Sequence, residues 1–189
     1  MPSVIQQLDE RALVWIAEHV RCALLDPLMK LYTLMGNTGL LFIALGLVML
    51  FWRPTRKAGA SALCAMLIGL IVVNFTIKPL VSRPRPWLVM ENFVNLVPER
   101  DPNSFPSGHT NAAFAFALAV CASAPRRWMK VTAVCMAAVM GLSRLYVGVH
   151  FPSDVLAGAA IGSLCGLLGA WAVKKAWERF STRLPKAPE

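Results

Sequence analysis

The sequence predicts an all-α fold: a polytopic membrane helical bundle of about five transmembrane helices, preceded by an N-terminal amphipathic interfacial helix. Composition is the first indication. Of the 189 residues, 57% are hydrophobic and 15% are charged, whereas about 25% of the residues in a soluble domain are charged. The second indication is the grouping of apolar residues into long runs, since a helix needs about 20 residues to cross a bilayer. We expect a single domain over residues 1–189.

Residues 4–32 are expected to form the amphipathic element. Apolar residues such as Leu13 and Val20 recur with a period of about 3.6, but charged residues such as Glu18 interrupt any continuous apolar core. A helix with this pattern lies along the membrane interface more readily than it crosses the hydrocarbon. Pro27 is expected to break or kink the helix. A sixth span within this segment is the alternative.

Each of the next five apolar runs is predicted to cross the membrane. They cover Gly36–Trp52, Ala58–Ile77, Gly108–Ala124, Met129–Gly148 and Pro152–Val173. The third run is short and the fourth carries Arg144 near its end, so we expect both helix ends to border a polar site instead of bare hydrocarbon. The helical bundle is therefore expected over residues 36–177, followed by a cytoplasmic tail over 178–189.

The basic residues predict the orientation of the bundle. They form three groups that share one side of the membrane if all five runs span it: Arg53, Arg56 and Lys57; Arg126, Arg127 and Lys130; and Lys174, Lys175, Arg179, Arg183 and Lys186. The positive-inside rule makes that side cytoplasmic. The net charge of +9 comes from these short groups and not from one continuous patch, so we expect no nucleic-acid partner.

Three polar segments are expected together at the opposite, outer side. The first is Lys78–Pro86, which reads Lys-Pro-Leu-Val-Ser-Arg-Pro-Arg-Pro. Taken alone, a basic, proline-rich helix end is typical of an anchor to lipid headgroups, because long basic side chains extend to the interface. Arg83-Pro84 repeats the Arg85-Pro86 step, so both arginines are candidates for contact with an anion.

The second segment, Phe105–Thr110, lies where the third run begins. Ser107 is expected to cap a helix. Gly108 has no Cβ, so its backbone can approach a ligand closely. A helix N-terminus with free N–H groups favours a bound anion, and His109 on the first turn is a candidate proton donor. The alternative is an ordinary helix cap followed by an interfacial histidine.

The third segment, Ser143–Asp154, links the fourth and fifth runs. His150 precedes Asp154 by four residues, so their side chains can meet. A carboxylate that accepts the Nδ1–H of an imidazole leaves Nε2 free as a nucleophile. The alternative is a structural histidine–aspartate cap of the last helix. Arg144 at bilayer depth favours a functional site, because charge within the membrane is usually functional or paired.

Together, the three segments meet the needs of phosphoryl transfer. This reaction requires neutralisation of the phosphate oxygens, an in-line nucleophile and a protonated leaving group. Lys78, Arg85 and Arg144 supply the charge, and His109, His150 and Asp154 supply the acid, the nucleophile and its partner. These few ligand-type residues and the lack of a dense carboxylate cluster predict no metal site and no cofactor.

The three segments resemble the motifs of the type-2 phosphatidate phosphatase superfamily, K-x6-R-P, P-S-G-H and S-R-x5-H-x3-D. The matching positions are Lys78, Arg85, Pro86, Pro106, Ser107, Gly108, His109, Ser143, Arg144, His150 and Asp154. The resemblance implies that His150 is the nucleophile, oriented by Asp154, and that His109 protonates the leaving oxygen. It also implies that the phosphate is held by Lys78, Arg85, Ser107, Gly108 and Arg144, without a metal. The five apolar runs set the chain apart from the superfamily's soluble vanadium haloperoxidases.

The small size resembles that of members that dephosphorylate undecaprenyl diphosphate. We therefore expect an inner-membrane lipid phosphatase that acts outside the cytoplasm and has the bilayer and a lipid phosphate as its partners. Phosphatidylglycerophosphate, phosphatidate and lipid A are alternative substrates, and a second lipid or sugar is an alternative acceptor to water. A non-catalytic lipid-phosphate binder or transporter is the alternative of a different class. The sequence leaves the oligomeric state open.

Overall fold

The computed structural model describes residues 3–181, and within this range it is helical, with one isolated β-bridge between Pro84 and Asn103. The longer helices are α1 Val4–His19, α2 Leu25–Met35, α3 Leu40–Phe51, α4 Arg56–Leu70, α7 Gly108–Ser123, α8 Arg127–Tyr146 and α9 Pro152–Ser181. The shorter ones are the 3₁₀-helices η1 Asn37–Gly39 and η2 Arg53–Thr55, the π-helix η3 Ile71–Ile77, and α5 Lys78–Val81 and α6 Pro86–Val89. The predicted all-α class is confirmed. The predicted tail, 178–189, lies outside the described residues from 182 onward.

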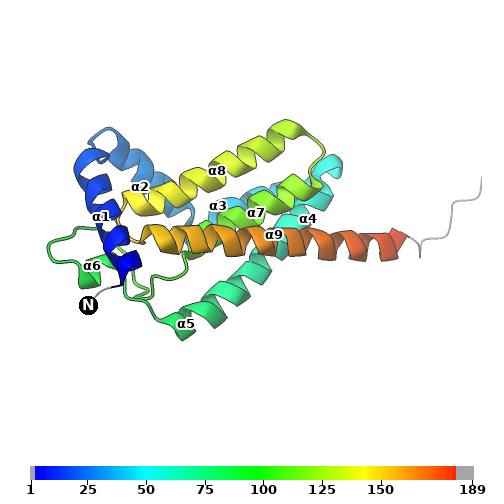
Figure 1. Ribbon diagram of the computed structural model, residues 1–189. Coiled ribbons are helices and arrows are strands. Elements are labelled where there is room, and N and C mark those ends of the chain that lie inside the picture. The colour runs from blue at the N-terminus through cyan, green and yellow to red at the C-terminus, as the bar shows by residue number, and fades with distance from the viewer. Residues whose placement is uncertain (1–2, 182–189) are drawn as a thin grey trace, which may run out of the picture.

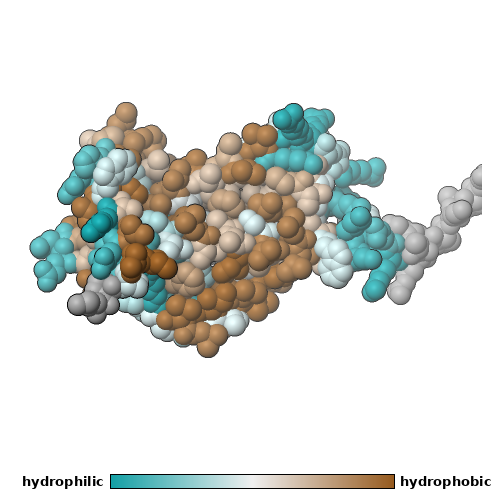
Figure 2. Space-filling view, in the orientation of Figure 1, coloured by the Kyte–Doolittle hydropathy of each residue, from teal (hydrophilic) through white to brown (hydrophobic). Residues whose placement is uncertain are grey.

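The helices form an elongated bundle with polar ends and an apolar middle. Figure 1 shows α9 running along the bundle beside α4, α7 and α8, with α1 and α6 at one end. Figure 2 shows hydrophobic residues over the middle of this face and hydrophilic residues at both ends. This is the surface expected of a bundle that crosses a bilayer, and the chain is a multi-pass membrane protein.

The spans differ in length from those expected. Three stretches of the described chain are long and apolar enough to cross a membrane: Arg53–Val81, Arg127–Tyr146 and Pro152–Phe180. A fourth is present if α2 and the helix after it, bent by 56°, count as one span. The bend lies at Thr38 and Gly39, whose backbones have φ of 52° and 74°. The third expected span is α7, which has only 16 residues because Ser107 caps it at the polar site.

The N-terminal segment contains two helices. The expected amphipathic element over residues 4–32 comprises α1 and most of α2, which are separated at Val20–Leu24. The break therefore precedes Pro27, which lies in the first turn of α2, where a missing N–H group costs no helical hydrogen bond. Leu13 and Asp9 are the buried residues of α1.

A glycine stripe brings α9 against α7 without intervening side chains. A Cβ atom at Gly162 would lie 2.4 Å from the Asn111 carbonyl oxygen, and α7 backbone atoms lie similarly close to the neighbouring glycines of the stripe, Gly158 and Gly166. Small residues spaced four apart permit such approach between membrane helices. As a result, the two helix N-termini meet, and the Ser107 N–H donates to the Asp154 carbonyl oxygen at 3.0 Å.

Contacts between basic and aromatic side chains connect the loops at one end of the bundle. Lys57 lies over the Trp177 ring at 5.7 Å, and Arg126 lies over the Trp52 ring at 5.6 Å. These contacts join the three basic groups identified in the sequence. The polar segments that contain Lys78, His109 and His150 lie at the other end.

Candidate active site

A cavity of about 730 Å³ lies among α3, α4 and α7 and reaches the polar segments that contain Lys78, His109 and His150. Its polar part is lined by Asn74, Lys78, Arg85, Glu99, Asp101, Gly108, His109, Asn111 and His150. Its apolar part is lined by Ile43, Leu63, Met66, Leu67, Leu70 and Ala112, together with Gly36, Thr38 and Gly39. The cavity is therefore continuous from a charged pocket to a groove lined by apolar side chains.

His150, between α8 and α9, is 1% exposed, and its two ring nitrogens face different partners. Nε2 lies 3.2 Å from Arg85 Nη1, and Nδ1 lies 3.4 Å from Ser104 Oγ. A guanidinium only donates hydrogen bonds, so Nε2 must be the acceptor and the proton of the neutral ring must be on Nδ1. The unprotonated nitrogen, Nε2, therefore faces the cationic side of the site, where it accepts from Arg85.

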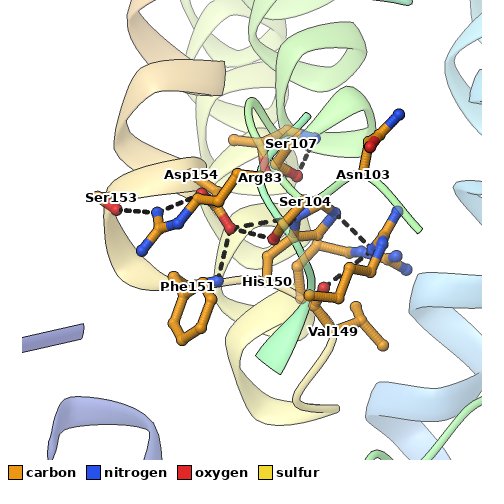
Figure 3. A network of polar contacts seen from close by, with 12 residues as sticks. Arg83, Asn103, Ser104, Ser107, Val149, His150, Phe151, Ser153 and Asp154 are labelled. Carbon is orange, nitrogen blue, oxygen red and sulfur yellow. Dashed lines mark hydrogen bonds and ion pairs between the residues drawn. The ribbon is translucent and has the colours of Figure 1, made fainter. Parts of the chain in front are cut away.

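Asp154, in the first turn of α9, is fully buried beside His150. Its Oδ2 lies 3.6 Å from His150 Nδ1, too far for a hydrogen bond, but it accepts the Ser104 hydroxyl and the Phe151 N–H, the latter at 2.8 Å. Ser104 therefore bridges Asp154 and His150, as Figure 3 shows. The spacing of His150 and Asp154 predicted direct contact between them, and nothing in the sequence indicated Ser104 except its place two residues before Pro106.

Two carboxylates of the connection before α7 face the cationic residues. Lys78 Nζ donates to Asp101 Oδ2, and Arg85 Nε donates to the Asp101 carbonyl oxygen at 2.6 Å. Arg85 also donates to the Val149 carbonyl oxygen at 2.9 Å and lies 3.7 Å from Glu99 Oε2. Arg85 is 1% exposed and Lys78 is 8% exposed. The expected cation cluster is thus assembled around Glu99 and Asp101.

Arg144 lies near the end of α8 and is 1% exposed. Its Nη1 donates to Thr33 Oγ1 at 2.7 Å, and its Nη2 donates to Glu99 Oε2 at 2.9 Å. Its Nε has no hydrogen-bond partner among the described residues. A buried donor without a partner is costly, and Arg144 itself is not among the residues that line the cavity.

The N-terminus of α7 forms another wall of the cavity. Ser107 caps the helix, because its Oγ accepts the Thr110 N–H at 3.4 Å, and the Ser107 side chain is buried. A Cβ atom at Gly108 would lie 3.2 Å from Asn74 Oδ1, so glycine keeps this wall open. His109 Nε2 lies 2.9 Å from Asn37 Oδ1, a partner that the sequence analysis did not identify.

Arg83 occupies a different place from Arg85. Its Nη1 donates to Asp154 Oδ1 at 2.7 Å, on the side of the carboxylate away from Ser104 (Figure 3). Of the two candidate arginines, Arg85 lines the cavity, and Arg83 contacts the partner of the histidine.

The surroundings of His150 favour the neutral imidazole. Burial is the main cause that holds the pKa of His150 well below its usual value. Nearby positive charges lower this pKa further, and they belong to Arg85, Arg144 and Lys78. Burial alone would raise the pKa of Asp101, but its hydrogen bond from Lys78 lowers the pKa below the usual value. The site therefore combines a neutral histidine with an ionised carboxylate.

The described part of the chain contains no group of three or more His, Cys, Asp or Glu side chains placed to hold a metal ion. Asp101, Glu99 and Asp154 contact arginine, lysine or serine instead.

Several relatives and solved structures are similar to this chain. It is 34% identical over 125 residues to an undecaprenyl-diphosphatase of Sulfolobus acidocaldarius, a match that covers 64% of this chain and 58% of the relative. It is 30% identical over 146 residues to the undecaprenyl-diphosphatase BcrC of Bacillus subtilis, with 77% and 74% covered. The structure is similar to that of LpxE of Aquifex aeolicus, with a TM-score of 0.76, 28% identity, and 86% and 94% of the two chains covered.

A second solved structure is similar over most of the chain. It is a phosphatidylglycerolphosphate phosphatase of Bacillus subtilis, described as a transmembrane protein of the PAP2 type. The TM-score is 0.73 at 27% identity, and the alignment covers 92% of this chain and 88% of that one. A family model described as the PAP2 superfamily matches residues 58–178, well over half of the sequence. This confirms the predicted resemblance: the chain belongs to the PAP2 superfamily.

Proposed function

We propose that this protein is a metal-independent lipid phosphatase that hydrolyses a phosphate monoester or diphosphate of a membrane lipid through a phosphohistidine. The observation that carries this proposal is the continuity of the cavity, in which His150, His109, Lys78 and Arg85 share one space with an apolar groove. A lipid headgroup fits the charged part, and its chain fits the groove between α3, α4 and α7. One pocket thus suits both halves of an amphipathic substrate.

The proposed reaction has two displacements at phosphorus. Once Arg85 turns its N–H from His150 Nε2 to the phosphate, this unprotonated nitrogen attacks phosphorus as the bond to the leaving oxygen breaks. His109, which lines the same cavity, gives its proton to that oxygen. Water then attacks the phosphohistidine and gives its proton to His109, so that inorganic phosphate leaves, neutral His150 is restored and His109 regains the proton that it donated.

The phosphate oxygens have donors on several sides. Lys78 and Arg85 line the cavity and supply positive charge, and Arg144 adds positive charge from its place behind Glu99. The N-terminus of α7, capped by Ser107 and opened by Gly108, adds backbone donors. Such fixed donors stabilise the charge that develops in the transition state.

Undecaprenyl diphosphate is the substrate that we favour, because two relatives carry the name undecaprenyl-diphosphatase. Other relatives, including one of Porphyromonas gingivalis, are named lipid A phosphatases, and one similar structure is a phosphatidylglycerolphosphate phosphatase. These lipids and phosphatidate are therefore the rival substrates.

We further propose that the protein lies in the inner membrane and acts outside the cytoplasm. The basic loops at the opposite end of the bundle support this orientation by the positive-inside rule. The whole chain then forms one phosphatase domain, in which residues 36–177 are the catalytic bundle.

The test is a substrate panel with the purified full-length protein in detergent micelles. We expect phosphate release from prenyl diphosphates to exceed that from glycerolipid monophosphates when the two are compared by kcat/KM. EDTA should leave the rate unchanged, and a large loss that zinc or magnesium reverses would refute the metal-independent mechanism. Absence of release from every lipid would favour a binder or a transporter.

A further inference from the structure

Arg83, in the connection between α5 and α6, does not line the cavity but joins three parts of the chain. Its guanidinium donates four hydrogen bonds. Nη1 donates to Asp154 Oδ1 and Ser153 Oγ, each at 2.7 Å, and Nη2 donates to Asp9 Oδ2 at 2.7 Å and Gln6 Oε1 at 2.6 Å. The planar fork of arginine suits such two-sided bonding, which a lysine cannot reproduce.

Asp9 lies on the packed face of α1 and is only 4% exposed. A buried carboxylate is costly unless it is paired and hydrogen-bonded. Besides Arg83, Asp9 accepts the Ser153 N–H at 3.0 Å and the Ser153 hydroxyl. Asp9 therefore fastens the first turn of α9, which carries Asp154, to α1.

The two carboxylate oxygens of Asp154 have separate tasks. Oδ2 faces His150 and accepts from Ser104, whereas Oδ1 accepts from Arg83. The bond to Arg83 consequently fixes the rotation of the carboxylate. Asp9 accepts from the same guanidinium. The positive charge of Arg83 is therefore shared by two carboxylates, Asp9 and Asp154.

We propose that Arg83 and Asp9 are positioning residues that hold the Asp154 carboxylate toward His150. Helix α1, which lies outside the residues matched by the family model, would then be part of the catalytic apparatus. This inference rests on the proposed function, because that function gives His150 and Asp154 their roles.

The first test compares Arg83→Gln and Asp9→Asn with the wild type, using the full-length protein and a prenyl diphosphate. We expect kcat to fall by about 10- to 100-fold, the scale of a small misplacement of reacting groups. KM should stay within about twofold, because neither residue lines the cavity. Arg11→Gln, on the exposed part of the same helix, is the matched control and should retain the wild-type kcat.

The pH profile separates positioning from a general loosening of the fold. Arg83→Gln removes a positive charge near His150, so the acidic limb of kcat/KM should move to higher pH. Asp9→Asn removes a negative charge, so the limb should move to lower pH. Arg83→Lys keeps the charge but loses the fork, so it should keep the wild-type limb with a reduced kcat. Thermal melting identifies the temperature range in which each variant is folded.

Two results would overturn this inference alone, provided that His150→Ala is inactive. The first is wild-type kcat in both Arg83→Gln and Asp9→Asn. The second is reduced activity with an unmoved acidic limb in both variants, which would indicate a structural role only. Hydrolysis by purified His150→Ala would instead overturn the proposed function itself.

Discussion

His150 lies between two charge networks that differ in how firmly they are held. The rear network contains Asp154 and Ser104 with Arg83 and Asp9 behind them. The front network contains Lys78, Arg85 and Arg144, which pair with Glu99 and Asp101. Both bring charge to the same ring, one at Nδ1 and the other at Nε2.

The rear network is closed and the front network is open. The side chains of Asp154 and Asp9 are 0% and 5% exposed, whereas those of Glu99 and Asp101 are 20% and 39% exposed. The front network also includes the unpaired Arg144 Nε, and no side-chain atom of the rear network is buried without a partner. This contrast predicts that the rear network fixes the imidazole, whereas the front carboxylates act as counter-ions that a bound phosphate replaces.

Removal of the His150 imidazole, which both networks contact, has the largest expected effect on turnover. His150→Ala should lower kcat by about 10⁴-fold or more, because a lost nucleophile leaves only binding and electrostatic assistance. His109→Ala should also stop turnover but should still bind inorganic phosphate, since the cations are intact. Phosphate release and binding to the purified variants check both statements. Substantial hydrolysis by His150→Ala would show that the two networks do not serve this ring.

The rear network is probed next with Ser104→Ala. The variant lacks the hydroxyl between His150 Nδ1 and Asp154 Oδ2, so the ring is held less well. We expect kcat to fall by about 100-fold with little change in KM. Ser163→Ala is the control, because that hydroxyl bonds only to a carbonyl oxygen of its own helix. A higher KM at unchanged kcat would assign Ser104 to substrate binding instead.

The cations of the front network and Asp154 of the rear network could be predicted from the sequence. The pairing of Glu99 and Asp101 with the cations, and of Arg83 with Asp154, could not. Lys78, Arg85 and Arg144 occur in spaced motifs at helix ends, and the order of the spans brings such ends together. The rear network depends on tertiary pairing, and no spacing rule indicates that Arg83 meets Asp154. Asp9 did carry a signal: it precedes the buried Leu13 by four residues and therefore shares the packed face of α1.

Parts of the fold escaped prediction for similar reasons. Hydrophobic runs predicted the helical bundle, but not where a helix begins. The first span starts late because Thr38 and Gly39 adopt left-handed conformations that hydropathy does not record. The close approach of α9 to α7 was also not predicted, although Gly158, Gly162 and Gly166 permit it. This approach places Asp154 beside Ser107.

If phosphate replaces the front carboxylates, removal of one of them should raise the affinity of the protein for phosphate. Glu99→Gln removes the carboxylate that pairs with Arg144, which destabilises the free site more than the phosphate-bound site. We expect inorganic phosphate to bind about tenfold more tightly, a typical coupling for one charge pair. Glu91→Gln, an exposed residue of the same connection, should leave the affinity unchanged. Weaker binding would mean that Glu99 holds the cations in place and is not displaced.

The smallest expected effect is a shift of the acidic limb of kcat/KM, which reports groups of the free enzyme. Burial and the front cations hold the pKa of His150 well below its usual value, so the wild-type limb due to this ring should lie below about pH 6.5.

Lys78→Met removes one of those cations and leaves Asp101 without its lysine partner. Both changes favour the protonated ring, so its pKa must rise and the limb must move to higher pH. Lys57→Met, at the far end of the bundle, should leave the limb in place, because its charge lies beyond the reach of screened electrostatics. An unmoved limb in Lys78→Met would mean that the front network does not control the charge of the imidazole. Burial and the rear network alone would then keep the His150 imidazole neutral.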